Sequence, residues 1–413
     1  MSTARARRSL VPLVTSLTAA SMLGTMGTTV LASIAPEAAR AFGLPAAMIG
    51  YQFSLMVGAM LASIAFLSNA SRRWGACRTI QAGVAITGVS LVLVLVPSLA
   101  CLAVGTLGMG AGHGLLMPAI SHLLVRFTPP VRLNLVFSVQ QAGIPLGSIL
   151  AATAGPLLTV WIGWQAAVAF AAAGLLVLAV AMQPWRAQWD DDRDATARIG
   201  RNPVAGLRLV AGSSTLGPLA LSGACFSAAQ FCVTTYTVVT LVEQLGFGLV
   251  EAGLVLTVAQ ALGVLSRIAC GWIADRHDNS LAVLTAVAVS ITVVGTAAFA
   301  LSPDWPRPLV WALFAALGAA TIGWPGVCFA LIGRLAPQGQ VPISTGGVLV
   351  YTNVGKLLGP MAFAAIYTGT ASAAAGFGAL VVPGVIATVA LVHAARKAGN
   401  AARAPRDGKL SGR

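Results

Sequence analysis

Twelve long apolar runs constrain the fold of this chain more than any other feature. A helix needs about 20 mainly apolar residues to cross the hydrocarbon core of a bilayer. Only 9% of the 413 residues are charged, against about 25% in a typical soluble domain, so the chain cannot cover a water-facing surface of its own size. The sequence therefore predicts an all-α polytopic membrane protein with spans at 11–35, 46–68, 79–98, 101–125, 134–157, 163–183, 216–242, 250–274, 281–301, 308–333, 343–369 and 373–394.

The basic residues alternate with the predicted spans. In a soluble protein the net charge of +14 would suggest a nucleic-acid-binding face, but here the basic residues lie in short gaps between apolar runs, so no nucleic-acid partner is expected. If the N-terminus is cytoplasmic, 21 Lys and Arg residues fall on the cytoplasmic side and only Arg40 and Arg307 on the other. A missed or additional span would break this alternation. The positive-inside rule therefore supports the span count and places both termini in the cytoplasm.

The N-terminus and the longest polar interval set the predicted domain organisation. Arg5, Arg7 and Arg8 before an apolar run are typical of a signal peptide, but the run 11–35 is longer than a signal-peptide core, so we expect it to be retained. The predicted domains are an N-terminal six-helix half (1–183), a cytoplasmic linker (184–212), a C-terminal six-helix half (213–394) and a cytoplasmic tail (395–413).

The linker carries a cluster of charges and two tryptophans. We expect the run Asp190-Asp191-Asp192 to form a solvated face rather than a binding site. Trp185 and Trp189 suggest a short interfacial helix at the membrane surface.

Short motifs repeat in the two halves. Arg126-Phe127-Thr128-Pro129 follows the fourth span, and Arg334-Leu335-Ala336-Pro337 follows the tenth. Two similar halves with a site at their interface near the bilayer midplane are typical of transporters. Over essentially its whole length the chain resembles the major facilitator superfamily, which implies twelve helices in two pseudo-symmetric six-helix halves.

A signature of that family, G-x-x-x-D-R-x-G-R-R, lies between its second and third spans. The junction between the eighth and ninth spans here reads Gly271-Trp272-Ile273-Ala274-Asp275-Arg276, with Asp278 at the next Gly position. The junction between the second and third spans keeps Arg73 and Gly75 but has Ser68 and Arg72 at the Gly and Asp positions. The resemblance implies a cytoplasmic gate, whereas composition alone equally allows solvated charges that only set the topology. The predicted gating residues are Asp275, Arg276, Gly271, Arg73 and Gly75.

Two basic residues fall inside predicted spans. Arg267 precedes Asp275 by eight residues, which places it roughly 12 Å inside the cytoplasmic end at 1.5 Å per residue, and Lys356 lies about midway along the eleventh span. A cation at the centre of a spanning helix costs about 2.5–3.5 kcal/mol on insertion scales. No intramembrane acid is available to pair with either, because the acids outside the cytoplasmic gaps fall near external ends: Glu37, Glu243, Glu251 and Asp304.

A transported anion would supply the missing negative charge. The alternative is structural: Arg267 reaches the interface or bonds helix-terminal carbonyls, and Lys356 bonds carbonyls near Pro360. The motif Arg267-x-x-x-Gly271-x-x-x-Asp275 resembles the eighth span of monocarboxylate transporters, whose Arg pairs with the substrate carboxylate. An eighth-span Arg with an eleventh-span Lys is also similar to the oxalate–formate antiporter. The acidic companion of animal monocarboxylate transporters, four residues before the Arg, is Gly263 here.

Polar side chains accompany these cations at helical spacing. Gln260 shares a face with Arg267, Asn353 shares one with Lys356, and Gln140 and Gln141 occupy the matching part of the fifth span. Such amides either orient a carboxylate or bond between helices. His113, in the middle of the fourth span, is the residue placed to relay a proton near neutral pH, although a lone His beside glycines also suits a packed, hydrogen-bonded role. Tyr51 is a candidate lining residue that packing alone would also explain.

The function that this pattern favours is secondary transport of a small organic anion, in particular a carboxylate, by alternating access, as proton symport or anion exchange. The alternative within transport is an efflux carrier for drugs or neutral metabolites. A membrane enzyme would require acid–base pairs and a sensor a soluble output domain, and neither pattern is present. We expect no cofactor and no metal, since the six Cys lack metal or redox spacing. Composition favours a bacterial inner membrane, and the family resemblance implies a monomer. Protons and the lipid bilayer are further expected partners.

Overall fold

The computed structural model of the chain describes residues 3–67, 70–128, 136, 139–196, 204–336 and 341–403. Part of the predicted linker, 197–203, and the end of the predicted tail, 404–413, lie outside these residues. Ser68 lies outside them too, as do six of the basic residues behind the charge bias: Arg132, Arg198, Arg201, Arg406, Lys409 and Arg413.

Twelve helical segments in the described ranges are long and apolar enough to cross a membrane, which confirms the predicted fold class. The spans of the first half are α1 (Thr3–Ser33), α3 (Ile49–Leu67), α5 (Ala76–Val94), α6 (Leu99–Phe127), α8 (Gly143–Trp161) and α9 (Trp164–Ala181). Those of the second half are α12 (Leu216–Glu243), α13 (Leu249–His277), α14 (Ser280–Ala298), α15 (Arg307–Ile322) with α16 (Pro325–Leu335), α17 (Val341–Thr370) and α18 (Ala373–Gly378) with α19 (Val381–Arg403). Short helices connect them: α2 (Ala35–Ala41), η1 (Ala46–Met48), α4 (Ala70–Trp74), η3 (Gln183–Trp185), α10 (Arg186–Trp189) and α11 (Val204–Gly212).

Two hydrophobic cores organise these helices. One is built from residues between Leu13 and Trp189, and the other almost entirely from residues between Val210 and Leu391. Glycines allow the helices within a half to pack closely. At Gly355 and Gly359 of α17, a Cβ atom would overlap the backbone of Ala224 and Ala228 in α12.

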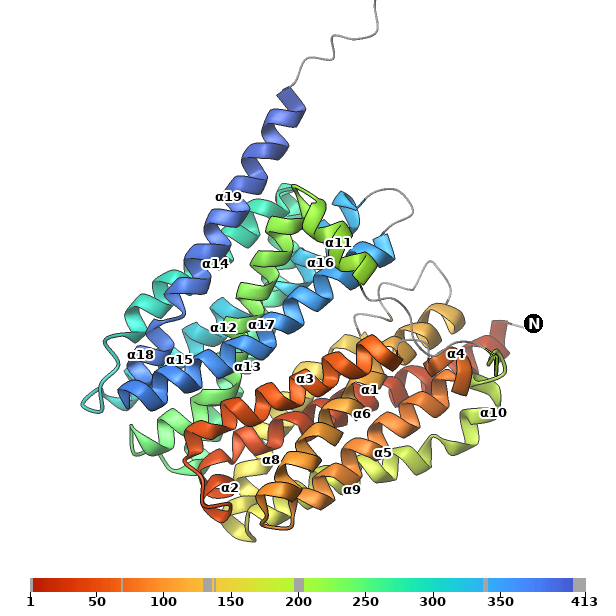
Figure 1. The fold of residues 1–413 in the computed structure, drawn as a ribbon, viewed down its shortest axis with the longest axis horizontal. Helices are drawn as coiled ribbons and strands as arrows, with labels where there is room; N and C mark the ends of the chain where they lie inside the picture. The colour runs from red at the N-terminus through yellow and green to blue at the C-terminus, as the bar shows by residue number, and fades with distance from the viewer. Residues whose placement is uncertain are drawn as a thin grey trace, which may run out of the picture.

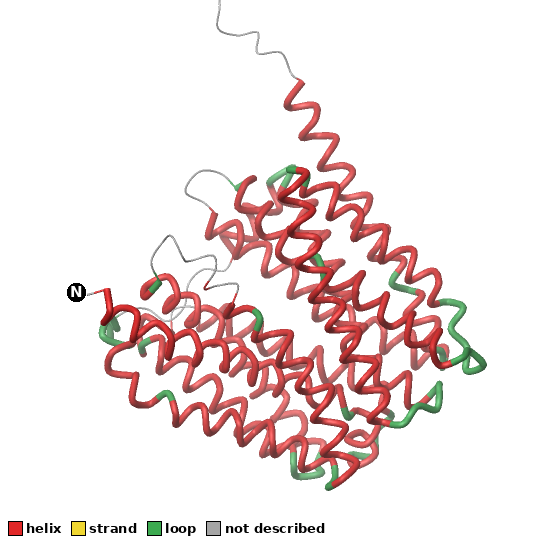
Figure 2. Tube along the Cα trace, turned by 180° about the vertical axis from the view of Figure 1, so that it is seen from behind, coloured by secondary structure: helices red, strands yellow, loops and turns green. Residues whose placement is uncertain are grey.

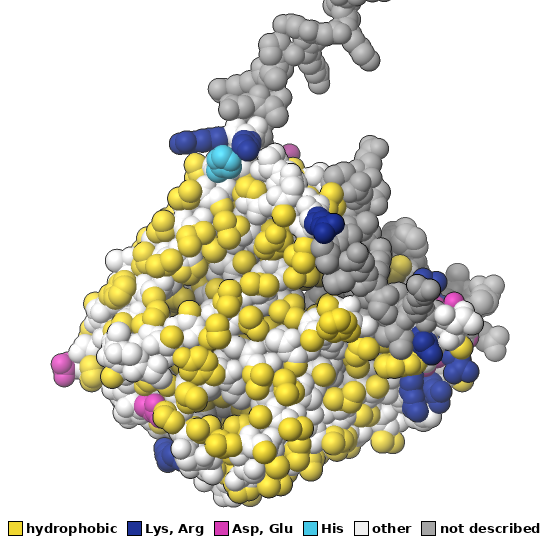
Figure 3. Space-filling model, viewed as in Figure 1, with side chains coloured by type: hydrophobic (Ala, Val, Ile, Leu, Met, Phe, Trp, Pro, Cys, Tyr) yellow, Lys and Arg dark blue, Asp and Glu magenta, His cyan; other side chains and the backbone are white. Residues whose placement is uncertain are grey.

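The two halves meet at one end and diverge toward the other (Figures 1 and 2). We call the end that carries α4, α10, α11 and α16 the basic end, because Lys and Arg side chains gather there, as Figure 3 shows for one face. Apolar side chains cover most of the rest of that face, as expected for a surface in contact with lipid. The other end, which we call the opposite end, carries two exposed ion pairs, Glu37–Arg40 at 3.0 Å and Glu251–Arg307 at 2.6 Å.

The two junctions that carry the signature motif share a backbone feature. Gly75 has φ +96°, and Asp278, at the Gly position of the other junction, has φ +45°. Asp tolerates this left-handed conformation better than most residues. It ends α13 there and accepts a hydrogen bond from Arg334 at 2.7 Å.

The expectation that the acidic run of the linker forms a solvated face is wrong at Asp190, whereas Asp191 and Asp192 of the same run are exposed. The Asp190 side chain is only 7% exposed, and its carboxylate accepts backbone N–H bonds from Cys77 at 2.7 Å and Arg78 at 3.1 Å. These are free donors at the first turn of α5, which attracts a negative charge. Asp192 pairs with His122 at 2.7 Å and with Arg126 at 2.8 Å. The sequence pattern could not reveal these partners because they come from other helix ends.

Candidate functional site

Lys356 on α17 lies in an aromatic environment at the contact between the halves. Its ammonium nitrogen is 4.3 Å from the ring centroid of Phe231 on α12 and 5.5 Å from that of Phe53 on α3. The two rings stack with centroids 5.5 Å apart. A cation over an aromatic face is attracted by the ring quadrupole, by about 2 kcal/mol or more where water is excluded.

No carboxylate within the described residues lies within the 4.0 Å ion-pair distance of Lys356 or Arg267. The aromatic rings offset part of the cost of the Lys356 charge, but they bring no negative charge. An anion 4 Å from the ammonium would gain on the order of 4 kcal/mol at an effective dielectric of 20. Lys356 is therefore a cation that no carboxylate of the described residues neutralises.

Arg267 on α13 faces a break in the tenth span. Two of its guanidinium nitrogens lie 3.5 Å from the carbonyl oxygen of Ile322, the last residue of α15. Gly323 and Trp324 separate α15 from α16, and Pro325 in the first turn of α16 provides no N–H for the preceding turn. The C-terminus of a helix carries a partial negative charge, so this contact stabilises the half-buried guanidinium. This contact uses only some of the five N–H donors of the guanidinium group.

His113 on α6 lies inside the first half. A Cβ atom on Gly24 of α1 would be 3.4 Å from its Nδ1, and that nitrogen is buried with no hydrogen-bond partner in the described structure.

The predicted amides mostly bond protein groups. Gln260 donates to the hydroxyl of Thr234 at 3.3 Å, and Gln140 donates to the hydroxyl of Ser21 at 2.5 Å. Both bonds join neighbouring helices, while Asn353 donates to the carbonyl of Leu349 in its own helix at 2.8 Å. The Oε1 of Gln140 is buried without a partner in the part of the chain that the structure describes. Gln141 and Tyr51 are half-buried, and Tyr51 packs against the core of the second half.

The predicted gating residues lie at the basic end, where the two halves are apart. Asp275, Arg276 and Arg73 are exposed. Arg276 lies over the ring of Trp272 with 5.3 Å between the guanidinium carbon and the ring centroid, and a Cβ on Gly271 would have no neighbour within 4 Å. Gly75 is instead buried, with Asp190 directly against it.

The halves are joined nearer the opposite end. The hydroxyl of Tyr236 lies 2.9 Å from the carbonyl oxygen of Ala47 and 3.2 Å from that of Pro360. Ser54 donates to the carbonyl of Leu357 at 2.6 Å. Leu357 directly follows Lys356, so the Ser54 bond and the aromatic environment of Lys356 belong to one interface between the halves.

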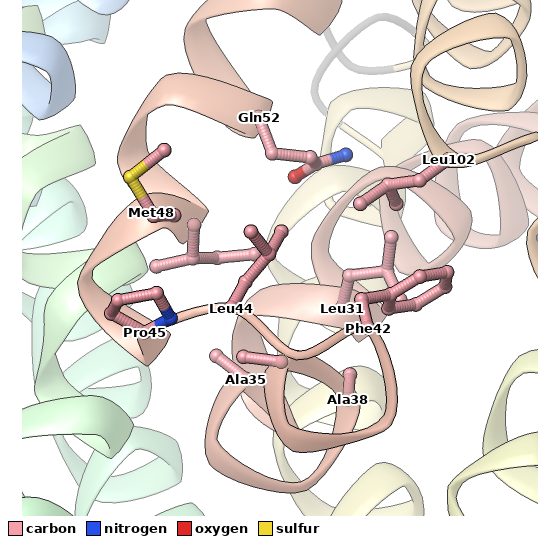
Figure 4. Close-up of a pocket in the computed structure, with 11 residues that line it drawn as sticks. Leu31, Ala35, Ala38, Phe42, Leu44, Pro45, Met48, Gln52 and Leu102 are labelled. Atoms are coloured by element: carbon pink, nitrogen blue, oxygen red, sulfur yellow. The ribbon is translucent and has the colours of Figure 1, made fainter. Parts of the chain in front are cut away.

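A small, half-open apolar pocket lies apart from these residues, toward the opposite end (Figure 4). It is lined by α1, α2, η1, α3 and α6, and its one polar side chain, Gln52, donates to Thr106 at 3.0 Å. None of the predicted substrate-binding residues lines it.

Sequence reasoning missed two of the residues nearest Lys356, Phe53 and Phe231. Each is one aromatic residue in a long apolar run, and its spacing within that run is the same as for a packing residue. Only the pairing of α3 with α17 across the two halves brings Phe53 to the cation. The periodicity of a single helix carries no information on that pairing.

Comparison with known proteins decides the family. The model of the Major Facilitator Superfamily matches residues 17–328. The chain belongs to the major facilitator superfamily. The members of this superfamily are transporters rather than enzymes, so the chain is a multi-pass membrane transporter.

Two relatives confirm the predicted resemblance to the monocarboxylate branch. Mouse monocarboxylate transporter 11 is 28% identical over 339 residues, covering 79% of this chain and 74% of the relative. The human protein of the same name is 26% identical over 343 residues, covering 79% and 70%.

Solved structures show the same superfamily fold. A bacterial homologue of the human lysosomal transporter Spinster, in an inward-facing and occupied conformation, has a TM-score of 0.71 at 16% identity and 98% coverage of both chains. A POT family transporter in complex with 5-aminolevulinic acid has a TM-score of 0.70 at 11% identity, covering 95% of this chain and 96% of that chain.

Proposed function

We propose that this transporter carries a small organic anion, in particular a carboxylate, by alternating access, either with a proton or in exchange for another anion. Arg267 and Lys356 bind the anion, and His113 takes up the proton in the symport mode. Gln140, Gln141, Gln260, Asn353 and Tyr51 complete the walls of the site.

The observation that carries this proposal is the environment of Lys356. The ammonium lies over two aromatic rings, and no carboxylate of the described residues is within ion-pair distance. A site of this kind favours an anion over a cation by Coulomb's law. The names of the mouse and human relatives, monocarboxylate transporter 11, point to the same substrate class.

The orientation follows from charge. The basic end carries most of the Lys and Arg residues, so we place it in the cytoplasm with both termini, in a bacterial inner membrane. The described conformation is then inward-facing. When the cytoplasmic side closes, the helix ends that carry the predicted gating residues approach one another. These residues are Asp275, Arg276, Gly271, Arg73 and Gly75. The two six-helix domains, 1–183 and 213–394, rock about the contacts around Tyr236.

The test is thermal stability of the purified transporter in detergent, at fixed ionic strength, with acetate, butanoate, benzoate and succinate. Butanamide is the neutral control. A ligand that binds only the folded state adds about 2.7 kcal/mol at a hundred times its dissociation constant. We expect at least one carboxylate to stabilise the transporter, and Lys356→Gln or Arg267→Gln to abolish that stabilisation.

Matched controls are Lys397→Gln and Arg396→Gln, which change exposed cations at the end of α19. These variants should keep the ligand response. If no carboxylate stabilises the protein, and neither Lys356→Gln nor Arg267→Gln alters transport in proteoliposomes, the anion hypothesis is wrong. A response to neutral or drug-like compounds would instead favour the efflux alternative.

A further inference from the structure

Lys356 contacts both halves of the transporter through its aromatic neighbours. Phe231 shares the second half with Lys356, whereas Phe53 belongs to α3 of the first half. Phe53 is fully buried, and Lys356, which lies over its ring, is half-buried. The ammonium therefore contacts one aromatic ring from each half.

Neighbouring contacts fix α17 against α3 at this point. Ser54, next to Phe53, donates to the carbonyl of Leu357, next to Lys356. A Cβ on Gly58, one helical turn further along α3, would lie 3.5 Å from the Leu357 side chain. The register of the two helices thus places the Phe53 ring beside the Lys356 ammonium.

The contact between Phe53 and Lys356 exists only while the halves are joined nearer the opposite end. When they separate there, α3 moves away from α17, and the ammonium loses one of its two rings. The charge then needs another partner, because the rings offset part of its burial cost. A bound carboxylate would be that partner, since its attraction to the ammonium exceeds that of an aromatic ring.

We propose that Phe53 and Phe231 are positioning residues that hold the Lys356 ammonium in the empty transporter, and that Phe53 couples anion binding to separation of the halves. The coupling rests on the proposed function, because the anion replaces the Phe53 ring as the partner of the ammonium. Without an anion, loss of the Phe53 contact opposes separation, so the empty transporter favours the described conformation.

The first experiment measures the empty transporter and needs no substrate. Spin labels on Arg193→Cys, in the part of the linker that is bound to the first half, and on His277→Cys, at the end of α13, report the distance between halves in a cysteine-free background. Phe53→Leu keeps an apolar side chain but removes the ring. We expect it to raise the ratio of short-distance to long-distance molecules by about tenfold, because the described conformation loses a stabilising contact.

A double-mutant cycle separates this effect from packing. In a Lys356→Gln background, Phe53→Leu should change the distance ratio by less than about twofold, because the cation is gone. Phe53→Tyr and Phe53→Trp, which keep an aromatic face, should leave the ratio close to that of the parent. Phe226→Leu is the matched control, since its ring packs on Trp324 with centroids 5.8 Å apart, whereas Lys356 lies over Phe53 and Phe231.

If Phe53→Leu changes the distance ratio equally with and without Lys356, Phe53 acts by packing and the proposal is overturned. No change in the distance ratio would overturn it as well. If Phe53→Leu does not fold, the cycle is run with Phe53→Met, which also removes the ring and for which the same outcomes apply. Sodium butanoate, compared with sodium chloride at equal ionic strength, then tests the coupling. It should raise the short-distance fraction in the parent and much less in Phe53→Leu.

These outcomes are distinct from failure of the proposed function. If no carboxylate binds but the Phe53–Lys356 cycle shows coupling, the aromatic positioning stands and the anion assignment falls. If a carboxylate binds and shifts the distances equally in the parent and in Phe53→Leu, the anion site stands and the coupling through Phe53 is overturned.

Discussion

The hydroxyl of Tyr236 lies 2.9 Å from the carbonyl oxygen of Ala47, and this contact joins the two halves near the opposite end. Tyr236 also lies 3.2 Å from the carbonyl of Pro360, and its ring stacks on Phe363 with centroids 4.0 Å apart. The residue is fully buried. One side chain of α12 therefore bonds η1 of the first half while it packs on α17 of the second.

Removal of this hydroxyl is expected to weaken closure of the opposite end. Tyr236→Phe keeps the ring and its stacking but leaves the Ala47 carbonyl without that donor, at a cost of about 1–2 kcal/mol. The fraction of molecules with a closed basic end should rise about fivefold to thirtyfold, measured by spin-label distances between Arg193→Cys and His277→Cys. The control is Tyr351→Phe, which removes the hydroxyl of a half-buried tyrosine on α17. An unchanged distance distribution would mean that the hydroxyl bond does not contribute to closure.

Gly50 is expected to be indispensable for the same closure. A Cβ at this position would overlap the Tyr236 hydroxyl and lie 2.5 Å from the carbonyl oxygen of Pro360. Gly50→Ala should therefore disfavour the described conformation by about 1–3 kcal/mol, as overpacking does elsewhere. It should shift the spin-label distances in the direction of Tyr236→Phe.

The control for Gly50→Ala is Gly43→Ala on the nearby loop, where a Cβ would have no neighbour within 4 Å, although φ +66° adds local strain. Combining Gly50→Ala with Tyr236→Phe should give less than the sum of the two shifts, because both act on the same contact. A fully additive result would contradict a shared mechanism.

The fold could be predicted from the sequence because lipid imposes a simple requirement on it. Every spanning segment must be a long apolar helix that satisfies its own backbone, and such runs can be counted directly. The predicted and observed spans differ by a few residues at their ends, as for the eighth, 250–274 against α13, Leu249–His277. The break at Gly323 in the tenth span was missed, since the apolar pattern continues through it.

The site could be predicted only in part. Arg267 and Lys356 stand out because a charge in an apolar run is costly. Their partners do not, because the Ile322 carbonyl and the Phe53 ring come from other helices and carry no charge. The burial of Asp190 was missed for the same reason: its donors are backbone N–H groups of α5, which every residue except proline possesses.

Arg126 is expected to hold the linker on the first half. It pairs with Asp191 and Asp192 and lies 3.3 Å from the carbonyl of Trp189. Partly exposed pairs contribute about 0.2–1 kcal/mol each, so Arg126→Gln should increase local opening of 190–196 by a few fold. Limited trypsin digestion at the exposed Arg193 measures this opening.

Arg307→Gln, which breaks a comparable pair at the opposite end, should leave the cleavage rate unchanged. An equal rate in Arg126→Gln would mean that the backbone contacts of Asp190 hold the linker alone.

Asp190 is expected to make stability depend on pH in a defined direction. Burial raises the pKa of its carboxyl above the ordinary 3.8, and the amides of Cys77 and Arg78 oppose this only in part. The folded state then binds the proton more tightly than the unfolded state, so stability is lost as the pH rises from the ordinary pKa through the folded pKa.

Asp190→Asn has no such titration. The melting temperature of the parent minus that of Asp190→Asn should therefore increase on acidification from about pH 7 to about pH 4, because all other groups cancel in the difference. Asp190→Ala, which leaves both amides without an acceptor, should cost about 0.5–2 kcal/mol at neutral pH. A difference that decreases on acidification would show that the two amide bonds outweigh burial at this carboxylate.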